Sequence, residues 1–313
     1  MSIFIEGNLF KQIRKNSLTM PLYYINILFK YKKRGFDDMK TIYNCFPGGK
    51  FKALTMSYDD GREADKRLVE LFNKHGIKGT FHLNSGLIDI ENQVPNDKYG
   101  YRIPRNEIVD IYKGHEVSAH TMTHPTIARC PMAHVINEVI EDRRRLEEIM
   151  KYPVRGMSYP NGSYSEDIKN MLPYVGIEYS RVVEETGNFE LPTDLYEWKA
   201  TCHHNHKLLE IADEFLGLHR SQLLYLFYVW GHSYEFNRDN NWELIEEFCE
   251  KIGNRDDIWY ATNIEIVDYM NAFNNLKFSM DGSFVYNPSV QSVWISVDGK
   301  IYEIKGGKQV DLV

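Results

Sequence analysis

The feature that most constrains the fold is an alternation of short apolar runs with segments of helical periodicity, extending from about residue 52 to residue 275. Residues 51–57 (FKALTMS) are predicted as a buried strand. Residues 64–74 space their apolar side chains as a helix does, and Gly76 ends that helix. Repeated strand–helix units of this kind predict a parallel α/β architecture rather than a β-sandwich.

The same pattern continues along the chain. Further strands are predicted at residues 78–83, 115–119, 154–159, 177–183, 197–202, 223–229 and 258–262. Helices are predicted at residues 107–112, 132–150, 166–172, 207–215, 242–252 and 264–272. Seven or eight strands, each followed by a helix, favour a closed or distorted (β/α) barrel. Because the chemistry of such barrels lies at the carboxyl ends of the strands, polar residues just beyond those ends are the candidates for a site.

The two ends of the chain depart from this pattern. Beyond residue 275, Asp-Gly and Asn-Pro turn signals separate short alternating strands, so residues 276–313 are predicted as a small β appendage and residues 39–275 as the barrel.

Residues 1–38 form an N-terminal extension in which a basic KKRG run lies just upstream of Met39. Purine-rich codons for that run would resemble a bacterial ribosome-binding site. We therefore hypothesise that translation begins at Met39.

The composition argues against several classes of protein. A formal net charge of −7, without a basic stripe interleaved with aromatics, disfavours a nucleic-acid binder and favours a neutral or small polar substrate. The four cysteines are scattered without a C-x-x-C pair, which disfavours a disulfide framework and a thiolate zinc site. The apolar run at residues 20–29 is shorter than the roughly 20 residues that span a bilayer, and lysines follow it instead of a cleavage site. We therefore expect a cytoplasmic protein without a membrane partner.

Two motifs at strand ends carry metal-ligand chemistry. Asp59 and Asp60 follow the first strand, and adjacent carboxylates repel each other unless a cation or a proton separates their roles. Alone, Asp-Asp-Gly is typical of a turn. His120 and His124 follow the strand at residues 115–119, and two histidines at this spacing with one carboxylate give the three-ligand, open-position set of a catalytic metal. The occurrence of both motifs at strand ends favours a metal site over coincidence.

Two further motifs follow later strands. Residues 155–162 (RGMSYPNG) run into a Pro-Asn-Gly turn, which can present a backbone N–H to a reacting oxygen but is equally common as a structural turn. Residues 229–235 (VWGHSYE) place His232 after an apolar strand. A lone histidine there is usually structural, yet a hydrolase needs an acid to protonate its leaving group.

The order and spacing of these four segments resemble the polysaccharide deacetylase family, also called carbohydrate esterase family 4, over about residues 50–270. The run SYDDG that contains Asp59 and Asp60 is similar to the family's Thr-Phe-Asp-Asp-Gly, whose first aspartate is the base and whose second binds metal. His120 and His124 match the family's two histidine ligands. The resemblance also implies a distorted barrel of parallel strands, in agreement with the strand count.

The resemblance further implies a mechanism and a substrate class. A divalent cation, Zn²⁺ first with Co²⁺, Mn²⁺ or Ni²⁺ as alternatives, would bind water and the amide carbonyl, and Asp59 would remove a proton from that water. Pro160-Asn161-Gly162 matches the family's Pro-x-Gly turn, whose Asn161 N–H would meet the oxyanion. His232 matches the histidine of the family's Leu-x-His motif and would protonate the leaving amine. An N-acetylated sugar or oligosaccharide would give acetate and a free amine.

The sequence departs from the family pattern at three places. Ser158 stands where the family often has an arginine that orients the catalytic aspartate, and Arg155, three residues earlier, is the candidate to replace it. Trp230 replaces the usual leucine, a change that packing should tolerate. The acidic partner that tunes His232 has no clear match, and its candidates are Asp194, Glu197 and Glu235.

Other polar and aromatic residues are weaker candidates. Four residues near the predicted rim are candidate substrate contacts, namely Tyr159, Pro160, Trp230 and Tyr234. The run HHNH at residues 203–206 looks like a metal cluster, but we interpret it as a polar loop that precedes a helix.

Two alternatives to a sugar deacetylase stay open. Relatives of the family hydrolyse other amides or cyclic imides, although they commonly lack the full metal triad. A catalytically silent sugar-binding barrel is the other alternative. The presence of Asp59 and His232 beside the ligands argues against it, because a binding protein needs neither a base nor an acid.

Overall fold

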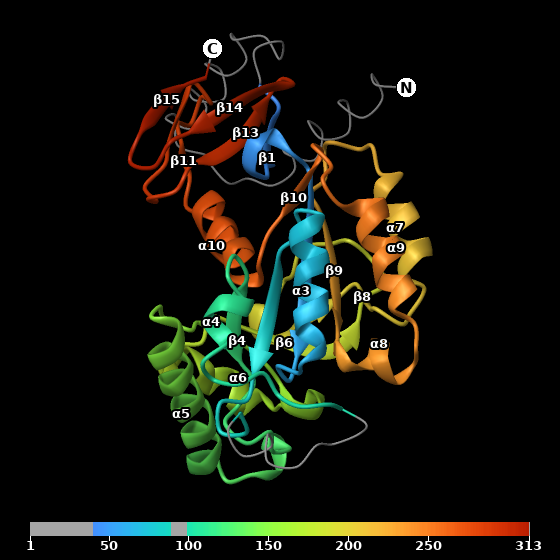
Figure 1. The fold of residues 1–313 in the computed structure, drawn as a ribbon. Helices are drawn as coiled ribbons and strands as arrows, with labels where there is room; N and C mark the ends of the chain where they lie inside the picture. The colour runs from blue at the N-terminus through green and yellow to red at the C-terminus, as the bar shows by residue number, and fades with distance from the viewer. Residues whose placement is uncertain (1–39, 89–98, 313) are drawn as a thin grey trace, which may run out of the picture.

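The computed structural model describes residues 40–88 and 99–312 (Figure 1). At its centre lies a sheet in which every neighbouring pair of strands is parallel. Its strands are β2 (Lys52–Asp59), β3 (Gly79–Leu83), β4 (Glu116–Ala119), β5 (Gly156–Ser158), β6 (Tyr179–Glu185), β7 (Trp198–Ala200), β8 (Cys202–His203), β9 (Tyr225–Gly231) and β10 (Ile258–Tyr260). The strand order is β7-β6-β5-β4-β3-β2-β9-β8, with β10 paired to the beginning of β2.

One short segment connects the two ends of this strand order. Strands β7 and β8 are consecutive and are interrupted only at Thr201. β7 pairs with β6 whereas β8 pairs with β9, and the Thr201 N–H donates to the carbonyl of Tyr228 in β9 at 2.8 Å. The strand order is therefore that of a distorted barrel, with the strands carried by eight chain segments. The predicted α/β fold with seven or eight parallel strands is confirmed.

Helices and short 3-10 turns connect the strands. Figure 1 shows α5 and α9 on opposite sides of the sheet, with α10 between the sheet and the C-terminal strands. The helices are α3 (Ala64–Lys74), α4 (Ile108–Ile111), α5 (Met132–Met150), α6 (Glu166–Met171), α7 (Leu208–Leu216), α8 (Tyr234–Arg238), α9 (Trp242–Ile252) and α10 (Asn263–Asn274). The 3-10 turns are η2 (Pro47–Gly49), η4 (Ile127–Arg129), η5 (Pro160–Gly162), η6 (Leu172–Val175) and η7 (Leu195–Glu197).

Two apolar clusters hold these layers together. The larger one fills the space between the sheet and its surrounding helices, where side chains such as Leu54, Phe72 and Phe227 are fully buried. The second cluster lies around α10 and joins the base of the barrel to the C-terminal strands through Tyr269 and Ile295. Because the barrel and the C-terminal strands share buried side chains, they form one packed body.

The C-terminal strands form two small antiparallel sheets. One contains β13 (Val293–Val297) and β14 (Lys300–Ile304), with β1 (Ile42–Cys45) added from the other end of the described chain. The other contains β11 (Lys277–Phe278), β12 (Phe284–Tyr286) and β15 (Gln309–Asp311). The tight turn between β13 and β14 places Asp298 and Gly299 at positive φ, 50° and 84°, as an Asp-Gly hairpin requires.

Some sequence-based expectations fall outside the described residues, namely the N-terminal extension at 1–38 and the apolar run within it. Within residues 40–88 and 99–312, no helix is long and apolar enough to cross a membrane. The four cysteines are all free thiols.

Candidate active site

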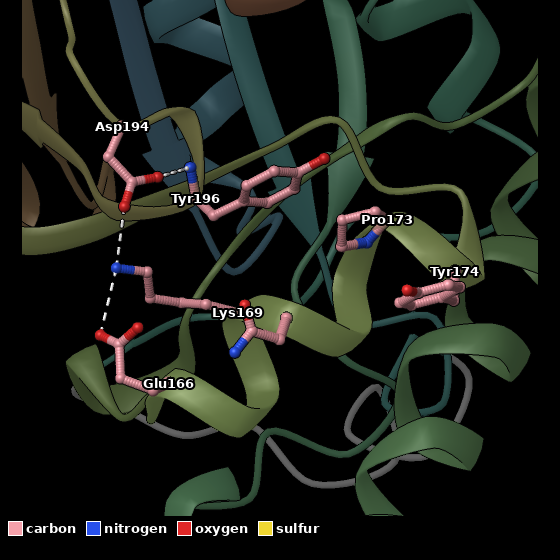
Figure 2. A pocket seen from close by; sticks show the side chains of 7 residues that line it. Glu166, Lys169, Pro173, Tyr174, Asp194 and Tyr196 are labelled. Atoms are coloured by element: carbon pink, nitrogen blue, oxygen red, sulfur yellow. Dashed lines mark hydrogen bonds and ion pairs between the residues drawn. The ribbon is translucent and has the colours of Figure 1, made fainter.

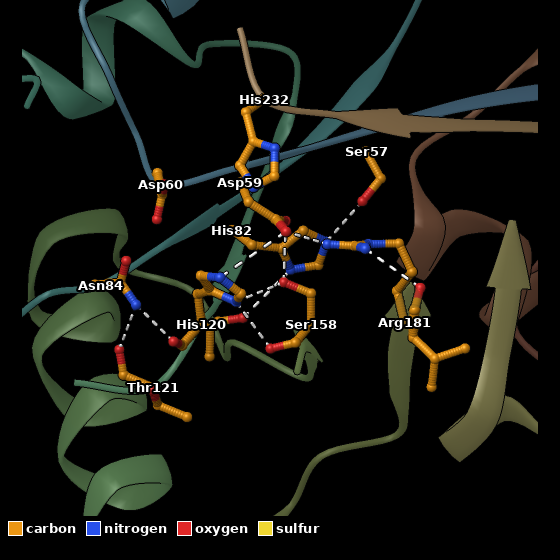
Figure 3. A network of polar contacts seen from close by, with 12 residues as sticks. Ser57, Asp59, Asp60, His82, Asn84, His120, Thr121, Ser158, Arg181 and His232 are labelled. Atoms are coloured by element: carbon orange, nitrogen blue, oxygen red, sulfur yellow. Dashed lines mark hydrogen bonds and ion pairs between the residues drawn. The ribbon is translucent and has the colours of Figure 1, made fainter. Parts of the chain in front are cut away.

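The polar segments predicted from the sequence meet around one cavity of about 560 Å³. They follow β2, β4, β5 and β9, and the carboxyl ends of parallel strands lie at the same edge of a barrel. The predicted ligands, base and acid all line the cavity, as do four more of the predicted residues: Asp59, Asp60, His120, His124, His232, Tyr159, Asn161, Trp230 and Tyr234. Figure 3 shows the polar network that contains Asp59, Asp60, His120 and His232.

Asp60, His120 and His124 can hold a metal ion together. One ligand atom from each lies within 4.8 Å of the others. Nδ1 of His120 lies 2.9 Å from the carbonyl oxygen of Ser158 and 2.7 Å from its hydroxyl, so the ring proton belongs on Nδ1. Burial lowers the pKa of His120 to about 4, which keeps the ring neutral and leaves Nε2 with a lone pair. One carboxylate and two imidazoles fit a divalent cation such as Zn²⁺.

The backbone of Asp60 turns sharply to present this carboxylate. Its φ is 82°, in the left-handed region that non-glycine residues rarely adopt, and its N–H donates to the carbonyl of His82 at 2.9 Å. Arg102 donates to the Asp60 carbonyl and lies 3.8 Å from the carboxylate. Burial opposes ionisation of Asp60, but His120, His232 and Arg102 hold its pKa below the usual range. Asp60 is therefore an anionic ligand at neutral pH.

Asp59 has side-chain partners of its own in Arg181 and Ser158 (Figure 3). The Arg181 guanidinium donates to its Oδ2, and the Ser158 hydroxyl donates to its Oδ1 at 3.0 Å. Asp59 is only 3% exposed, and Arg181 is fully buried. Although burial opposes the charge, Arg181 together with His120 holds the pKa of Asp59 well below its usual range. Asp59 is therefore an ionised carboxylate in a fixed orientation.

The expectation that Arg155 orients Asp59 is corrected by this geometry. Arg155 lies immediately before β5, at the amino end of the strand, whereas the cavity lies at the carboxyl end. Its guanidinium pairs with Asp268 at 2.6 Å and with Glu178 at 3.1 Å. Arg181 takes the orienting role from the neighbouring strand β6. The sequence did contain a signal for this role, namely a single arginine within the predicted strand at residues 177–183. An arginine in a buried strand must be paired with an opposite charge.

His232 has Glu235 as its acidic neighbour. Nδ1 of His232 lies 3.7 Å from Oε1 of Glu235, three residues later in the first turn of α8. Burial opposes the charged imidazolium, but Glu235 and the two aspartates raise the pKa of His232. Burial likewise opposes the charge of Glu235, yet the surrounding histidines hold its pKa well below the usual range. The raised pKa of His232 and the lowered pKa of Glu235 favour a protonated His232 beside an ionised Glu235.

The other two candidates for this acidic partner lie elsewhere. Asp194 and Glu197 each approach Lys169 of α6 at 2.8 Å. Figure 2 shows Asp194 and Lys169 at a separate hollow of about 380 Å³, which Tyr174 and Tyr196 also line. Neither carboxylate lines the larger cavity. Glu235 is therefore the carboxylate that acts on His232.

His203 and His204 surround the other oxygen of Glu235. Their Nε2 atoms lie 3.0 Å and 3.2 Å from Oε2, so the three side chains also form a set of possible metal ligands. The Asn205 N–H donates to Nδ1 of His203 at 3.2 Å, however, which places the proton of the neutral ring on Nε2. His203 therefore presents a proton to Glu235 rather than a lone pair to a metal. We interpret this cluster as the support of Glu235.

The predicted substrate contacts differ in their surroundings. The Trp230 ring lies over the Arg181 guanidinium at 4.4 Å, so it also packs the buried ion pair. Tyr234 lies 5.1 Å from the His232 ring, and the Tyr159 hydroxyl donates to the carbonyl of Tyr196. Pro160 is buried in its turn and is not among the residues that line the cavity. The candidate substrate wall therefore consists of Trp230, Tyr234 and the edge of Tyr159.

Comparisons with known proteins find a matching family model, a relative and a similar fold. Residues 47–180 match the family model described as Polysaccharide deacetylase. Over 120 residues the chain is 27% identical to a chitooligosaccharide deacetylase from Bradyrhizobium sp. (strain ANU 289), covering 37% of this chain and 49% of that protein. The chain thus spans about half the length of this relative. A solved structure assigned to the polysaccharide deacetylases, from Mycobacterium smegmatis, shares the fold with 13% identity and a TM-score of 0.53, covering 74% of this chain and 94% of that chain.

The separate surroundings of the two adjacent aspartates predict different effects on metal binding. His120→Ala removes a ligand and should abolish stoichiometric Zn²⁺ binding. Asp59→Asn should retain Zn²⁺, because Asp59 is not one of the three ligands and its carboxylate is already bonded to Arg181 and Ser158. Mass spectrometry of the metal content after Zn²⁺ reconstitution and gel filtration measures both. Equal loss of Zn²⁺ in the two variants would contradict this division.

Proposed function

We propose that the chain is a metal-dependent hydrolase that removes N-acetyl groups from a carbohydrate, starting from the match of residues 47–180 to the polysaccharide deacetylase family model. One observation carries the proposal: a three-ligand set, a separately oriented carboxylate and a histidine with its own acidic partner line the same cavity. The chitooligosaccharide deacetylase among its relatives supports an N-acetylated sugar or oligosaccharide as the substrate class.

The ligand set defines the cofactor that we propose. Asp60, His120 and His124 would hold one divalent cation, and Zn²⁺ suits a carboxylate and two imidazoles best, with Co²⁺, Mn²⁺ or Ni²⁺ as alternatives. When bound, the cation would polarise the amide carbonyl and increase the acidity of water. The chain itself supplies the ligand side chains, the open face of the cavity and the groups that move protons.

Asp59 is the proposed base. Its carboxylate lines the cavity, and Arg181 and Ser158 fix its orientation from the opposite side. It would take one proton from the attacking water as the new carbon–oxygen bond forms. Asn161, which has a left-handed φ of 55° at the cavity wall, is the proposed source of a backbone N–H for the oxyanion. A donor of this type contributes roughly 10²- to 10³-fold to the rate.

His232 is the proposed acid. The amide carbon–nitrogen bond can break only if the departing nitrogen receives a proton, and Glu235 favours the protonated form of His232. The proton taken by Asp59 and the proton given by His232 balance the hydrolysis, which releases acetate and an amine. The opposite pKa shifts of Asp59 and His232 support this division into base and acid.

The cavity suits a substrate of sugar size. A volume of about 560 Å³ lies within the range of small-molecule sites, and Trp230 and Tyr234 offer aromatic surface at its wall. We also propose that the protein acts in the cytoplasm without a nucleic-acid or membrane partner. Its four free thiols fit a reducing compartment.

An acetate-release assay tests the proposed activity. The Zn²⁺-loaded protein should release acetate from N-acetylglucosamine or its oligomers. In Asp59→Asn, kcat should fall at least about 100-fold, since a positioned base contributes about 10²- to 10⁴-fold to the rate. Ring opening of cyclic imides without acetate release would favour the amide or imide alternative. Sugar binding without turnover of any substrate would favour the silent barrel.

The two arginines should affect catalysis very differently. Arg181→Met removes the cation that orients Asp59, so kcat/KM for acetate release should fall by at least about 100-fold, a loss typical of a small misplacement of a catalytic group. Arg155→Met breaks only two partly exposed ion pairs at the other end of the barrel and should leave kcat/KM unchanged. Circular dichroism confirms that both variants fold. Similar losses in the two variants would reject Arg181 as the orienting residue.

The partnership of His232 and Glu235 predicts a shift in the pH profile. The acid must be protonated, so kcat/KM should decline as the pH rises through the pKa of His232. Glu235 raises that pKa, and Glu235→Gln should therefore move the alkaline limb of the profile to lower pH. The same change at Glu197, which pairs with Lys169, should leave the limb in place. An unshifted limb in Glu235→Gln would show that another group sets it.

A further inference from the structure

The turn that carries both histidine ligands has an unusual backbone. Thr121 and His124 have φ values of 63° and 59°, in the left-handed region that a β-branched residue such as threonine rarely adopts. Such a conformation persists only where the surroundings fix it. The contacts around residues 120–124 must therefore hold a conformation that the isolated chain would not favour.

Two carboxylates of helix α5 hold the two halves of this turn. Asp142 accepts the His120 N–H through Oδ2 at 2.9 Å and the Ser85 N–H through Oδ1 at 2.7 Å. Glu138 accepts the Thr123 N–H through Oε2 at 2.8 Å and the Thr123 hydroxyl through Oε1 at 2.7 Å. All four carboxylate oxygens are therefore used on the ligand turn or on the loop beside it.

The neighbouring loop after β3 completes the frame. The Asn84 side-chain amide donates to the carbonyls of His120 and Thr121 at 2.6 Å and 3.0 Å. The Met122 N–H donates to the backbone carbonyl of Glu138 at 3.1 Å. Backbone groups along the turn thus have partners on helix α5 and on the loop after β3.

The position of the two carboxylates sets them apart from ordinary helix residues. Glu138 and Asp142 are one helical turn apart on the buried face of α5, among Val135, Val139 and Leu146. They are 4% and 0% exposed. Buried carboxylates are costly unless they are fully hydrogen-bonded. Neither side chain lines the cavity, so neither contacts substrate.

We propose that Glu138 and Asp142 are positioning residues that hold the turn from His120 to His124 in its metal-binding conformation before an ion binds. The proposal rests on the metal centre of the proposed function and adds a determinant of its affinity. If the turn is ordered in advance, binding of the ion does not have to supply the free energy of ordering it. A role confined to folding would lower thermal stability but leave the metal affinity of the folded protein unchanged.

Matched variants separate these two roles. Asp142→Asn keeps the size of the side chain but turns an amide toward a backbone N–H, and Glu138→Ala removes both acceptors. Glu138→Gln can still accept the Thr123 N–H and can donate to the Thr123 hydroxyl, so it is the rescue variant. Glu141→Gln removes a solvent-facing carboxylate that pairs with Arg144 on the same helix and is the control.

Two measurements report on the ligand turn. Competition with a chromophoric chelator gives the Zn²⁺ dissociation constant, and the visible spectrum of the Co²⁺-loaded protein reports the ligand geometry. Asp142→Asn and Glu138→Ala should bind Zn²⁺ about 10- to 100-fold more weakly, the usual effect of losing a residue that orients a ligand, and should show altered Co²⁺ bands. Glu138→Gln and Glu141→Gln should match the wild-type protein in both measurements.

The outcomes distinguish this proposal from the proposed function. Wild-type Zn²⁺ affinity and Co²⁺ spectra in folded Asp142→Asn and Glu138→Ala would overturn the positioning role and leave the metal centre intact. A wild-type protein that binds neither Zn²⁺ nor Co²⁺ would overturn the metal centre itself. If Asp142→Asn does not fold, the comparison of Glu138→Ala with Glu138→Gln decides the question.

Discussion

The buried ion pair between Asp59 and Arg181 is the interaction on which the rest of the site depends. The two residues belong to β2 and β6, and three strands lie between these in the sheet order. In a flat sheet, strands four places apart would be separated by roughly 19 Å. Their side chains can touch only because the sheet curves into a barrel. Breaking such a pair costs about 3–5 kcal/mol because it leaves an unpaired buried charge, so the fold and the orientation of Asp59 are coupled.

Hydrogen bonds extend from this pair to the other parts of the site. The Ser158 hydroxyl donates to Asp59 and accepts from Nδ1 of His120, so it connects the base with a metal ligand. Trp230 covers the guanidinium of Arg181, and His232 follows it by two residues on the same strand end. One hydrogen-bond network therefore positions the base and the ligand His120, and Trp230 joins it to the strand end that carries His232.

The sequence predicted the strands and residues of this network better than the contacts between them. The parallel α/β fold and the strand ends near Asp59, His120 and His232 followed from the apolar pattern, because burial on both faces of a parallel sheet leaves a strong signal. The orienting arginine did not follow. Arg155 is nearer to Ser158 along the chain, but it lies at the amino end of the strand, away from the site, and Arg181 reaches Asp59 only across the curved sheet.

The sequence also did not predict the two carboxylates that support the ligand turn, for a related reason. Glu138 and Asp142 share the helical face of Val135 and Val139, and this pattern indicates burial but not the partners that make burial of a carboxylate tolerable. The added strand β1 was also unpredictable, because its pairing with β13 joins residues about 250 positions apart and depends on the folded barrel.

Anomalous diffraction from crystals grown with Zn²⁺ tests the central claim most directly. The account predicts one strong zinc peak between Asp60, His120 and His124, with Asp59 still paired to Arg181. A peak between His203, His204 and Glu235 in its place, or zinc coordinated by Asp59 with Arg181 displaced, would contradict the account.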